Sequence, residues 1–356
     1  MFITKLFNIL TSASTEHVQN YPSSRLADVF DFQLFKLRFD FDFSTSYNYV
    51  LRVFNDSNIT QLTWQKYSFM IMMGIATAFF LGVREGKKLG IIPDIIIDGV
   101  LIIVPLSIIG TRLWYVAFEW SQYAAVFKSS GFVDGMINLV DITSGGLAIH
   151  GGFFTAFISA YFYAKYKKID ILAVFDIMAP GFLIAQSMGR WGNFFNQEAH
   201  GGVIGGKVGN ITNLTLDEQR AFLTDTLNIP DFITNNMYFS GGDGLNYYHP
   251  TFFYESVWNI TGFIIMLVLR RTKLVKQGDM LVIYLIWYSI GRYFIEAMRT
   301  DSLFIEGTSI RTAQLTSLLM IAGGVVFAVL LRTVFKAPSY ASVLEANREQ
   351  ITEQTN

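Results

Sequence analysis

The stretch that decides the fold runs from residue 171 to residue 201 and reads ILAVFDIMAPGFLIAQSMGRWGNFFNQEAHG. Its first part is an apolar run close to the length of about 20 residues that an α-helix needs to cross a bilayer. Its second part, from Gly189 to Gly201, brings an arginine, two asparagines, a glutamate and three glycines into one short segment. Charged and amide groups are costly near hydrocarbon, so their clustering at the end of a membrane helix indicates a functional site.

The composition of the whole chain is that of a membrane protein. Of its 356 residues, 52% are hydrophobic and only 15% are charged, which is too apolar for an ordinary soluble domain. The net charge of -1 gives no indication of nucleic-acid binding, and we expect no nucleic-acid partner. The chain has no cysteine, which excludes disulfides, thiolate metal sites and a cysteine nucleophile of its own. With only four histidines, we expect no metal or other cofactor.

Apolar segments of transmembrane length recur along the chain after residue 66. The sequence therefore predicts an all-α polytopic membrane protein with seven transmembrane helices. We expect three regions: an N-terminal extracytoplasmic region at 1–66, a membrane domain at 67–336 with an outer loop at 199–248, and a cytoplasmic tail at 337–356. The seven predicted helices are residues 67–83, 95–117, 145–164, 171–191, 252–269, 280–297 and 313–331.

The N-terminal region contains one segment with a clear period. Residues 35–43, FKLRFDFDF, alternate apolar and charged side chains. A period of two predicts a half-buried strand, and an amphipathic interfacial element is the alternative interpretation. The first ten residues are only weakly apolar and no small-residue cleavage site follows them, so no secretory signal peptide is predicted.

The basic residues of the loops predict the orientation in the membrane, because cytoplasmic loops carry an excess of lysine and arginine. The short loops on one side are consistently the richer ones, which places the N-terminus outside and the C-terminus in the cytoplasm. The cytoplasmic set is Arg84, Lys87, Lys88, Lys165, Lys167, Lys168, Arg270, Arg271, Lys273, Lys276, Arg332 and Lys336, and the outer set is Lys128, Lys207, Arg220, Arg299 and Arg311.

This orientation brings the unusual polar residues of five predicted helices to the same leaflet. Polar side chains inside a membrane domain mark substrate sites more often than they mark packing. We therefore expect a site in the outer half of the membrane. Its contributors are Arg112 near the end of the second helix, His150 at the start of the third, residues 190–198 at the end of the fourth, His249, Tyr254 and Glu255 at the start of the fifth, and Arg292, Glu296 and Arg299 at the end of the sixth.

The sixth predicted helix has the clearest spacing. Tyr288, Arg292, Glu296 and Arg299 recur at intervals that stack side chains on one helical face. One interpretation is a structural Arg–Glu–Arg ladder that joins helices. The other is a cationic face for an anionic lipid phosphate, a role that suits arginine because its planar fork stays charged and binds phosphate oxygens in pairs.

His150 stands between two glycine pairs, at residues 145–146 and 151–152. Glycine pairs allow a second backbone or a ligand to approach closely. The histidine is interpreted either as a hydrogen-bonded core residue or as a neutral imidazole that accepts a proton near pH 7, and the second interpretation is favoured by its neighbours and its outer position.

The remaining polar residues also have structural interpretations. Asn193 and Asn196 are suited to capping the end of the fourth helix, and Arg190 with Glu198 is a candidate ion pair at the interface. Asp176 lies deep in the same helix, where a buried hydrogen-bonding partner is the expected role. His249 and Pro250 predict a helix start, with proline in the first turn. The loop at 202–248 is either a lid or a substrate-binding arm.

Together these segments resemble the prolipoprotein diacylglyceryl transferase family. The family pattern Gly-Arg-x-Gly-Asn-Phe-x-Asn-x-Glu-x-x-Gly stands complete at 189–201, Gly-Gly-x-x-x-His-Gly-Gly stands at 145–152, His-Pro-x-x-x-Tyr-Glu stands at 249–255, and Arg-x-x-x-Glu-x-x-Arg-x-x-Asp/Ser stands at 292–302. The resemblance covers roughly residues 67–331. It departs from the family in the first helix, where only Tyr67 matches, and at Ala313, where a glycine commonly precedes Gln314.

The resemblance implies transfer of the diacylglyceryl group of phosphatidylglycerol to the thiol of a lipobox cysteine in a preprolipoprotein, in a bacterial plasma membrane. The products are a thioether and glycerol phosphate, and we expect a monomer. Two other functions stay open: a multipass transporter of an anionic solute, and a lipid-binding protein without catalysis. The expected catalytic residues are His150, Tyr288, Arg292 and Glu296. The residues expected to bind phosphatidylglycerol are Tyr67, Arg112, Arg190, Asn193, Glu198, Gly201 and Arg299. The residues expected to support both groups are Asp176, Asn196, His249, Tyr254 and Glu255.

Overall fold

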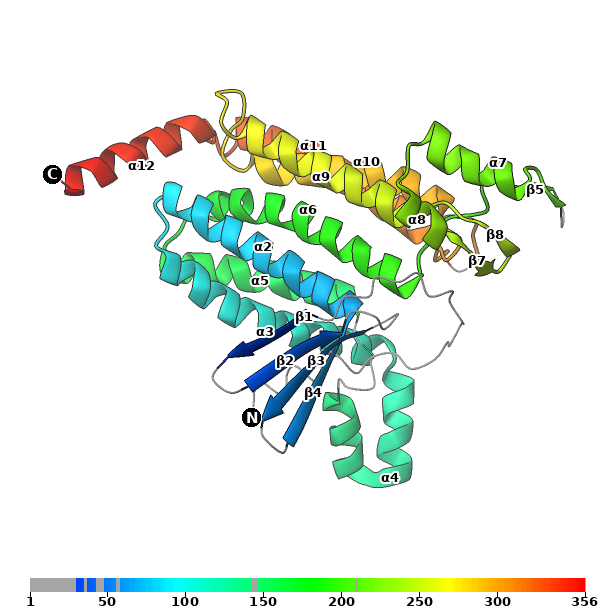
Figure 1. Cartoon of the computed structure of the whole chain (residues 1–356). Coiled ribbons are helices and arrows are strands. Elements are labelled where there is room, and N and C mark those ends of the chain that lie inside the picture. Colours follow the sequence, from blue (N-terminus) through cyan, green and yellow to red (C-terminus); the bar gives the residue numbers. More distant parts are fainter. Residues whose placement is uncertain are drawn as a thin grey trace. The chain divides into compact units, whose positions relative to one another are not determined.

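The structure is a computed structural model that describes residues 30–34, 37–42, 48–55, 58–141, 146, 148–208, 211–305 and 307–355. It is mostly helical (Figure 1). The chain forms two compact units, and each unit consists of segments that are not contiguous in the sequence. Unit 1 is Met1–Ser68, Phe80–Ile177 and Ala346–Asn356, and unit 2 is Phe69–Phe79 and Met178–Glu345.

Six of the described helices are long and apolar enough to cross a membrane. They coincide with six of the seven predicted spans. The remaining predicted span, 145–164, overlaps helix α5 (Ile149–Lys167), which is not one of the six. The membrane part is therefore all-helical and polytopic, as predicted. The six helices are α2 (Lys66–Lys88), α3 (Pro93–Phe118), α6 (Ile171–Asn196), α9 (Thr251–Leu269), α10 (Asp279–Met298) and α11 (Thr312–Thr333).

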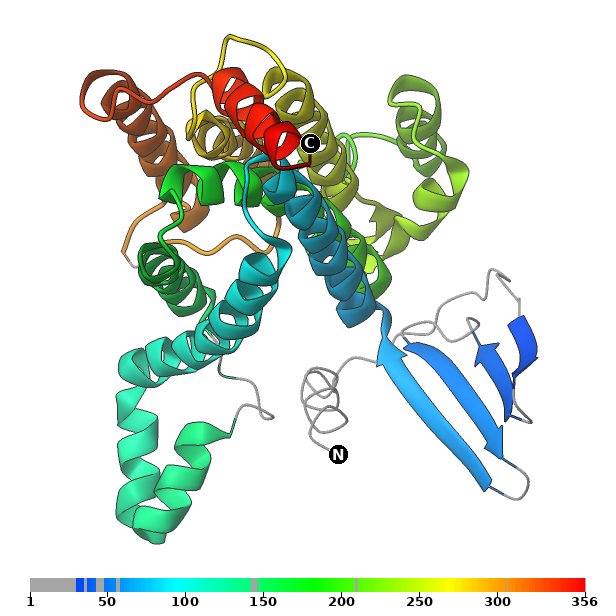
Figure 2. The same ribbon diagram turned by 90° about the vertical axis from the view of Figure 1, so that its left-hand side faces the viewer.

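Unit 1 begins with a four-stranded antiparallel sheet. The strands are β1 (Phe30–Leu34), β2 (Leu37–Asp42), β3 (Asn48–Asn55) and β4 (Asn58–Gln65), paired in sequence order. Strand β2 falls within the segment whose period of two predicts a strand. Residues 35, 36 and 43 of that segment lie outside the described part of the chain. Strand β4 leads into α2 with no residue between them (Figure 2).

The helices of unit 1 pack closely where glycines meet. A Cβ on Gly151 would lie 2.3 Å from the carbonyl oxygen of Gly110, so α3 and α5 touch backbone to backbone at this point. This contact agrees with the close approach predicted from the glycines beside His150. In the sequence, α4 (Trp120–Val140) follows α3 and precedes α5. It consists of two helical segments joined at Gly131, whose φ of 89° is a conformation that glycine adopts readily (Figure 1).

The membrane helices of unit 2 are joined by specific side-chain contacts. Helices α9, α10 and α11 lie side by side (Figure 1). Trp258 of α9 and Trp287 of α10 stack with ring centroids 4.4 Å apart, and each indole nitrogen donates to the backbone carbonyl of the other tryptophan. Arg332 of α11 binds both carboxylate oxygens of Asp279 at the start of α10, at 2.9 Å each. These contacts hold α10, which carries most of the candidate site, between two neighbours.

Residues 201–250 form a small subdomain of unit 2, here called the loop subdomain. It has a hydrophobic core of its own, which includes Ile204, Leu223 and Ile233, all fully buried. Thr215 and Glu218 form a reciprocal capping box at the start of its first helix. Its elements are β5 (Lys207–Val208), β6 (Ile211–Thr212), α7 (Leu216–Ala221), η1 (Phe222–Thr226), α8 (Asp231–Asn236), β7 (Tyr238–Gly241) and β8 (Gly244–Tyr247); after α11 the chain ends in α12 (Tyr340–Thr355).

Candidate active site

Three helices of unit 2 bring four ionised side chains together in what we call the ionic cluster: Arg190 of α6, Glu255 of α9, and Arg292 and Glu296 of α10. Arg190 Nη2 donates to Glu255 Oε1 at 2.7 Å. Arg292 Nη1 donates to the other oxygen, Glu255 Oε2, at 3.3 Å. Arg292 Nη2 also forms an ion pair with Glu296, one turn further along α10. One carboxylate therefore fixes both arginines.

The cluster is stable because its charges cancel. The side chains of Glu255 and Glu296 are only 2% and 3% exposed, so both carboxylates are removed from water. A buried charge is strongly unfavourable unless it is paired and hydrogen-bonded. Every charge of the cluster has a partner of opposite sign, and Glu255 accepts a hydrogen bond at each oxygen, whereas Glu296 Oε2 meets Arg292 as an ion pair without a hydrogen bond. The two arginines are less buried than the glutamates, with 21% of the Arg190 side chain and 16% of the Arg292 side chain exposed.

A row of amides extends the cluster towards the end of α6. Arg190 Nη1 donates to Asn193 Oδ1 at 3.2 Å, and Asn193 Nδ2 donates to Glu198 Oε1 at 2.9 Å. Asn196 Nδ2 reaches the same oxygen at 3.3 Å. Helix α6, the fourth predicted helix, ends at Asn196 and not at residue 191 as predicted. Asn193 thus links Arg190 to Glu198, the two residues predicted as a candidate ion pair, and Asn196 contacts Glu198 alone.

Tyr288 lies one turn before Arg292 on α10 and within electrostatic reach of Arg190, Arg292 and Glu255. Its ring stacks on Tyr284 with centroids 5.7 Å apart and planes 9° apart. The Tyr284 hydroxyl in turn accepts a hydrogen bond of 2.9 Å from Gln186 Nε2 on α6. The phenol of Tyr288 therefore lies beside the ionic cluster.

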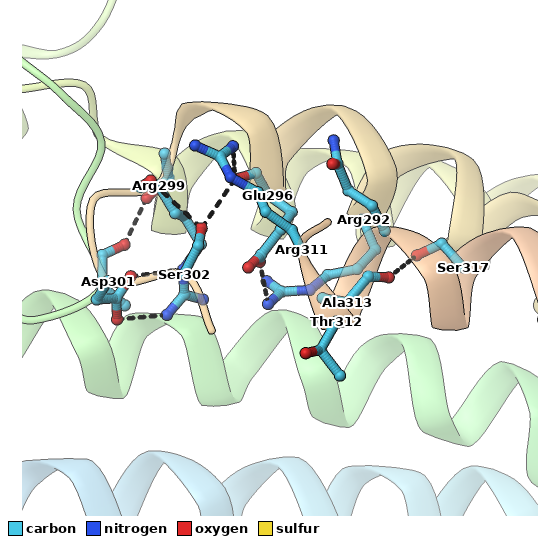
Figure 3. Close-up of polar contacts among 12 residues, drawn as sticks. Arg292, Glu296, Arg299, Asp301, Ser302, Arg311, Thr312, Ala313 and Ser317 are labelled. Carbon is cyan, nitrogen blue, oxygen red and sulfur yellow. Dashed lines mark hydrogen bonds and ion pairs between the residues drawn. The ribbon is translucent and has the colours of Figure 1, made fainter. Parts of the chain in front are cut away.

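Arg299 departs from the predicted stack on α10. The helix ends at Met298, and Arg299 has an extended backbone (φ -74°, ψ 143°). It pairs as an isolated bridge with Gly201, and its guanidinium binds both oxygens of Asp301 at 2.9 and 2.7 Å (Figure 3). The prediction that Arg299 shares a helical face with Arg292 is wrong, because the helix has already ended. Burial raises the pKa of Asp301, but the hydrogen bonds from Arg299 outweigh it and leave that pKa below its ordinary value.

Two residues of this region were not among the predicted site residues. Asp301 is the partner of Arg299. Arg311, at the start of α11, donates through Nη1 to the backbone carbonyl of Glu296 at 2.6 Å (Figure 3). Both lie in or beside the connection between α10 and α11. Asp301 is a local partner, two residues after Arg299, whereas Arg311 reaches Glu296 because the chain returns to the end of α10.

Gly201 and His249 lie where the loop subdomain joins the membrane helices. Gly201 N donates to His249 O at 2.9 Å, and a Cβ on Gly201 would lie 2.7 Å from His249 Cβ. The site therefore needs glycine here. His249 Nδ1 lies 3.2 Å from the hydroxyl of Tyr254, and burial lowers the pKa of the imidazole below its ordinary value. Helix α9 then begins at Thr251, one residue before the predicted start.

The other predicted residues belong to unit 1. Arg112 of α3 donates to three backbone carbonyls: Nε to Leu139 at 2.9 Å, Nη1 to Gly146 at 2.9 Å and Nη2 to Asn138 at 2.7 Å. These bonds hold the segment that leads to α5. That helix places His150 at its second residue, and the side chain of His150 lies outside the described part of the structure. Tyr67 is half-buried in the first turn of α2, and Asp176 is fully buried in α6.

These features define a class: a polytopic membrane protein with a charge-balanced arginine–carboxylate cluster at the ends of three helices. Comparison with known proteins narrows the class. Residues 57–330 match the prolipoprotein diacylglyceryl transferase family, and the chain belongs to that family. A phosphatidylglycerol–prolipoprotein diacylglyceryl transferase of Bacillus cytotoxicus is 42% identical over 271 residues, which are 76% of this chain and 89% of the relative. Proteins of the same name from Bacillus cereus and Bacillus thuringiensis are each 40% identical over the same lengths.

Proposed function

We propose that this protein transfers the diacylglyceryl group of phosphatidylglycerol to the thiol of the lipobox cysteine of a preprolipoprotein. The observation that carries the proposal is the pair of arginines, Arg190 and Arg292, held on one buried carboxylate at the ends of membrane helices. Membership of a family whose relatives are named for this reaction supports it. The same relatives give no support to the transporter alternative or to a lipid-binding protein without catalysis.

The reaction needs stabilisation of a leaving phosphate. The cysteine sulfur forms a bond to the glyceryl carbon, and the bond between that carbon and the phosphate oxygen breaks. Its electron pair stays on the oxygen, so glycerol phosphate leaves with one more negative charge than the phosphodiester carried. Donors aimed at that oxygen lower the barrier most effectively when they are already in place. Arg190 and Arg292 fulfil this role, and the neighbouring Asn193, Glu198 and Tyr288 hold the donor lipid in register.

The thiol must also lose its proton, since the thiolate is the nucleophile and an ordinary cysteine has a pKa of about 8.5. His150 is our first candidate for the base. The nearby arginines favour the thiolate as well, so a dedicated base is not a requirement of the mechanism. A pH–rate profile of the wild type and of His150→Gln separates these routes. Loss of the acidic limb in the variant assigns the proton to His150, and its persistence excludes that assignment.

Arg112 has a positioning role in this proposal. All three of its guanidinium nitrogens already donate to backbone carbonyls. It therefore acts through the segment before α5 and His150, rather than as a direct ligand of the phosphate. Arg299 and Gly201, bridged to each other, join the loop subdomain to the end of α10 beside the donor site. Glu296 completes the charge balance of Arg292.

The membrane placement completes the proposal. The six apolar helices make this a multipass membrane protein, and its relatives are bacterial. We place it in the bacterial plasma membrane as a seven-helix monomer, with α5 as the seventh span. The N-terminus and the site face the outer leaflet and the C-terminus faces the cytoplasm, in keeping with the basic residues of the loops.

The test is a reconstituted reaction. Purified protein in detergent is given phosphatidylglycerol and a lipobox peptide, and the peptide is analysed by mass spectrometry. The expected result is a peptide heavier by one diacylglyceryl group, with release of one glycerol phosphate for each thioether formed. Uptake of an anionic solute by sealed proteoliposomes without any turnover of lipid would contradict the proposal and favour the transporter.

A further inference from the structure

The sheet of strands β1 to β4 has no part in the reaction described above. The family match begins at residue 57, so β1, β2 and β3 lie before the part of the chain that the family shares. No residue of the four strands belongs to the ionic cluster or to the predicted set of site residues. The function of the sheet therefore has to be inferred from its own residues and from its place in the chain.

The strand register divides the sheet into two chemically different faces. Alternate residues of a strand belong to opposite faces, and residues paired across neighbouring strands belong to the same face. Phe39 pairs with Phe32 of β1 and with Val53 of β3. To this face, here called the apolar face, β1 and β2 contribute only apolar residues: Phe30, Phe32, Leu34, Leu37, Phe39 and Phe41.

The opposite face is mixed, and it holds all the charged residues of the four strands: Asp31, Arg38, Asp40, Asp42 and Arg52. Asp31 pairs with Asp40, which pairs in turn with Arg52. The apolar face thus contains none of the charges of these strands. An antiparallel sheet with one apolar and one charged face is suited to lie between an apolar phase and water.

The apolar face needs a cover, because a sheet that is apolar on one side is stable only when that side is buried. The described helices of unit 1 do not supply the cover, since none of them packs as a layer on the sheet. The apolar phase that covers this face therefore has another source, and the position of the sheet in the chain indicates which.

The connection between β4 and α2 identifies that source. Strand β4 ends at Gln65 and α2 begins at Lys66, so no flexible segment separates the sheet from the helix (Figure 2). Helix α2 is one of the six helices able to cross the membrane. The sheet is therefore held at the point where the chain enters the bilayer. Such a tether gives the lipid a far higher effective concentration at the sheet than a separate partner would have.

The residues of the apolar face that are closest to α2 along the chain have the chemistry of a membrane interface. Leu51, which pairs with Phe41, also pairs with Leu62 of β4. Two positions along on the same face, Tyr49 pairs with Trp64, and Trp64 precedes the start of α2 by two residues. Tryptophan and tyrosine concentrate where a bilayer meets water, because their rings are amphipathic.

We propose that the apolar face of this sheet rests on the surface of the membrane beside α2 and that the charged face is turned to water. The partner is the lipid itself, at the level of the headgroups and the upper acyl chains. An amphipathic element binds there in proportion to the apolar area that it buries. In the orientation proposed above, this surface is the outer leaflet. The inference concerns strands that lie largely before the family match, and it does not depend on the transferase function.

The absence of cysteine from the chain allows a direct test, because each introduced cysteine is then the only site for a thiol-reactive spin label. Arg38→Cys, Phe39→Cys, Asp40→Cys and Phe41→Cys follow one another along β2 and alternate between the two faces. The two charged-face variants are the matched controls. Met73→Cys, at an exposed position of α2, is the lipid reference. Each labelled protein is reconstituted as the full chain into vesicles of phosphatidylcholine and phosphatidylglycerol.

Electron paramagnetic resonance measures how often each label collides with oxygen and with a polar nickel chelate. Oxygen is apolar and concentrates in lipid, whereas the chelate stays in water. The oxygen-to-chelate ratio at positions 39 and 41 should approach that of Met73→Cys and exceed the ratio at positions 38 and 40 about tenfold, because a polar solute is excluded from an apolar medium. Leu51→Cys and Arg52→Cys should repeat this alternation in β3, which keeps the test valid if a β2 variant fails to fold.

A ratio at the level of a label in water at all four positions of β2 would overturn the proposal, because the sheet would then stand clear of the membrane. Few collisions with either reagent at positions 39 and 41 would also overturn it, since protein and not lipid would then cover the apolar face. Magnetic broadening between labels would in that case identify a second copy as the cover, and its absence would identify a segment of the same chain. Turnover is no part of the readout, so a failure of the transferase function leaves this test unaffected.

Discussion

Two groups of arginines in this molecule have different partners. In unit 1, Arg112 donates to the backbone carbonyls of Asn138, Leu139 and Gly146. In unit 2, Arg190 and Arg292 donate to the carboxylate of Glu255. From the sequence alone the three arginines cannot be told apart, because each is a cation near the end of a membrane helix, where burial of a charge costs free energy.

The difference in partners indicates a difference in function. Backbone carbonyls belong to the chain, so a ligand that replaced them at Arg112 would detach the segment before α5. A side-chain carboxylate and a phosphate offer arginine the same paired oxygen geometry. Phosphate oxygens can therefore share Arg190 and Arg292 with Glu255 without any change in the fold. Our proposal therefore gives Arg112 the role of positioning the chain, and Arg190 and Arg292 the role of binding the substrate.

The sharpest test of this comparison replaces the forked guanidinium by a single ammonium. Arg190→Lys keeps the charge beside Glu255 but loses the paired donors, and turnover should fall about 100-fold or more, the usual effect of removing a donor to a developing oxyanion. Arg332→Lys is the matched control, because Arg332 likewise donates to a buried carboxylate, that of Asp279 at the start of α10, although it does so through two nitrogens and Arg190 through one. Initial rates of thioether formation measure both. Equal losses in the two variants would show that ion pairing in general, and not this pair, supports catalysis.

A second test removes the charge that holds the two arginines. Glu255→Gln keeps the shape of the side chain but leaves Arg190 and Arg292 without their common counter-ion. Turnover should fall by more than tenfold, and the unfolding free energy should decrease by about 3 kcal/mol, because a broken buried ion pair leaves uncompensated charge. Rates and thermal unfolding in detergent measure the two effects. Turnover at the wild-type level would show that the arginines do not depend on Glu255 for their placement.

Arg112 should behave in the opposite way. Arg112→Lys leaves some of the three carbonyls unpaired, and a hydrogen bond to a charged group contributes about 1.5–3 kcal/mol. Hydrogen exchange at residues 138–141 and 146 should accelerate, while Arg190→Lys should leave exchange there unchanged. A variant with wild-type exchange but reduced affinity for phosphatidylglycerol would make Arg112 a direct ligand and remove the distinction between the two groups.

The smallest expected effect concerns His249, where the loop subdomain meets α9. Burial lowers the pKa of the folded imidazole, whereas the unfolded chain titrates near pH 6.5. The stabilising contribution is therefore complete above pH 6.5 and is lost as the pH falls through that value towards the lower folded pKa. The unfolding temperature should fall between pH 7.5 and pH 5.5, and it should fall less in His249→Gln. The same pH dependence in both proteins would exclude His249 as its source.

Sequence predicted what depends on local pattern. Six predicted spans coincide with helices, and the Arg292–Glu296 pair follows from a spacing of four residues on α10. Sequence did not predict that Glu255 joins Arg190 to Arg292, because that contact spans three helices. It also did not predict Asp301, which binds Arg299 two residues before it, or Arg311, which reaches the end of α10 through the return of the chain from α10 to α11. The stack on α10 failed at Arg299 because this residue lies just beyond the last helical residue, Met298, and has an extended backbone that pairs with Gly201.

The central claim is that Arg190 and Arg292, held on Glu255, bind the donor phosphate. Equilibrium binding of phosphatidylglycerol in the absence of any acceptor peptide tests it most directly, because no turnover can occur. Arg190→Lys should bind the lipid at least tenfold more weakly than the wild type, while Arg332→Lys should bind it with unchanged affinity. Equal affinity of Arg190→Lys and the wild type would contradict the claim and place the donor phosphate elsewhere in the molecule.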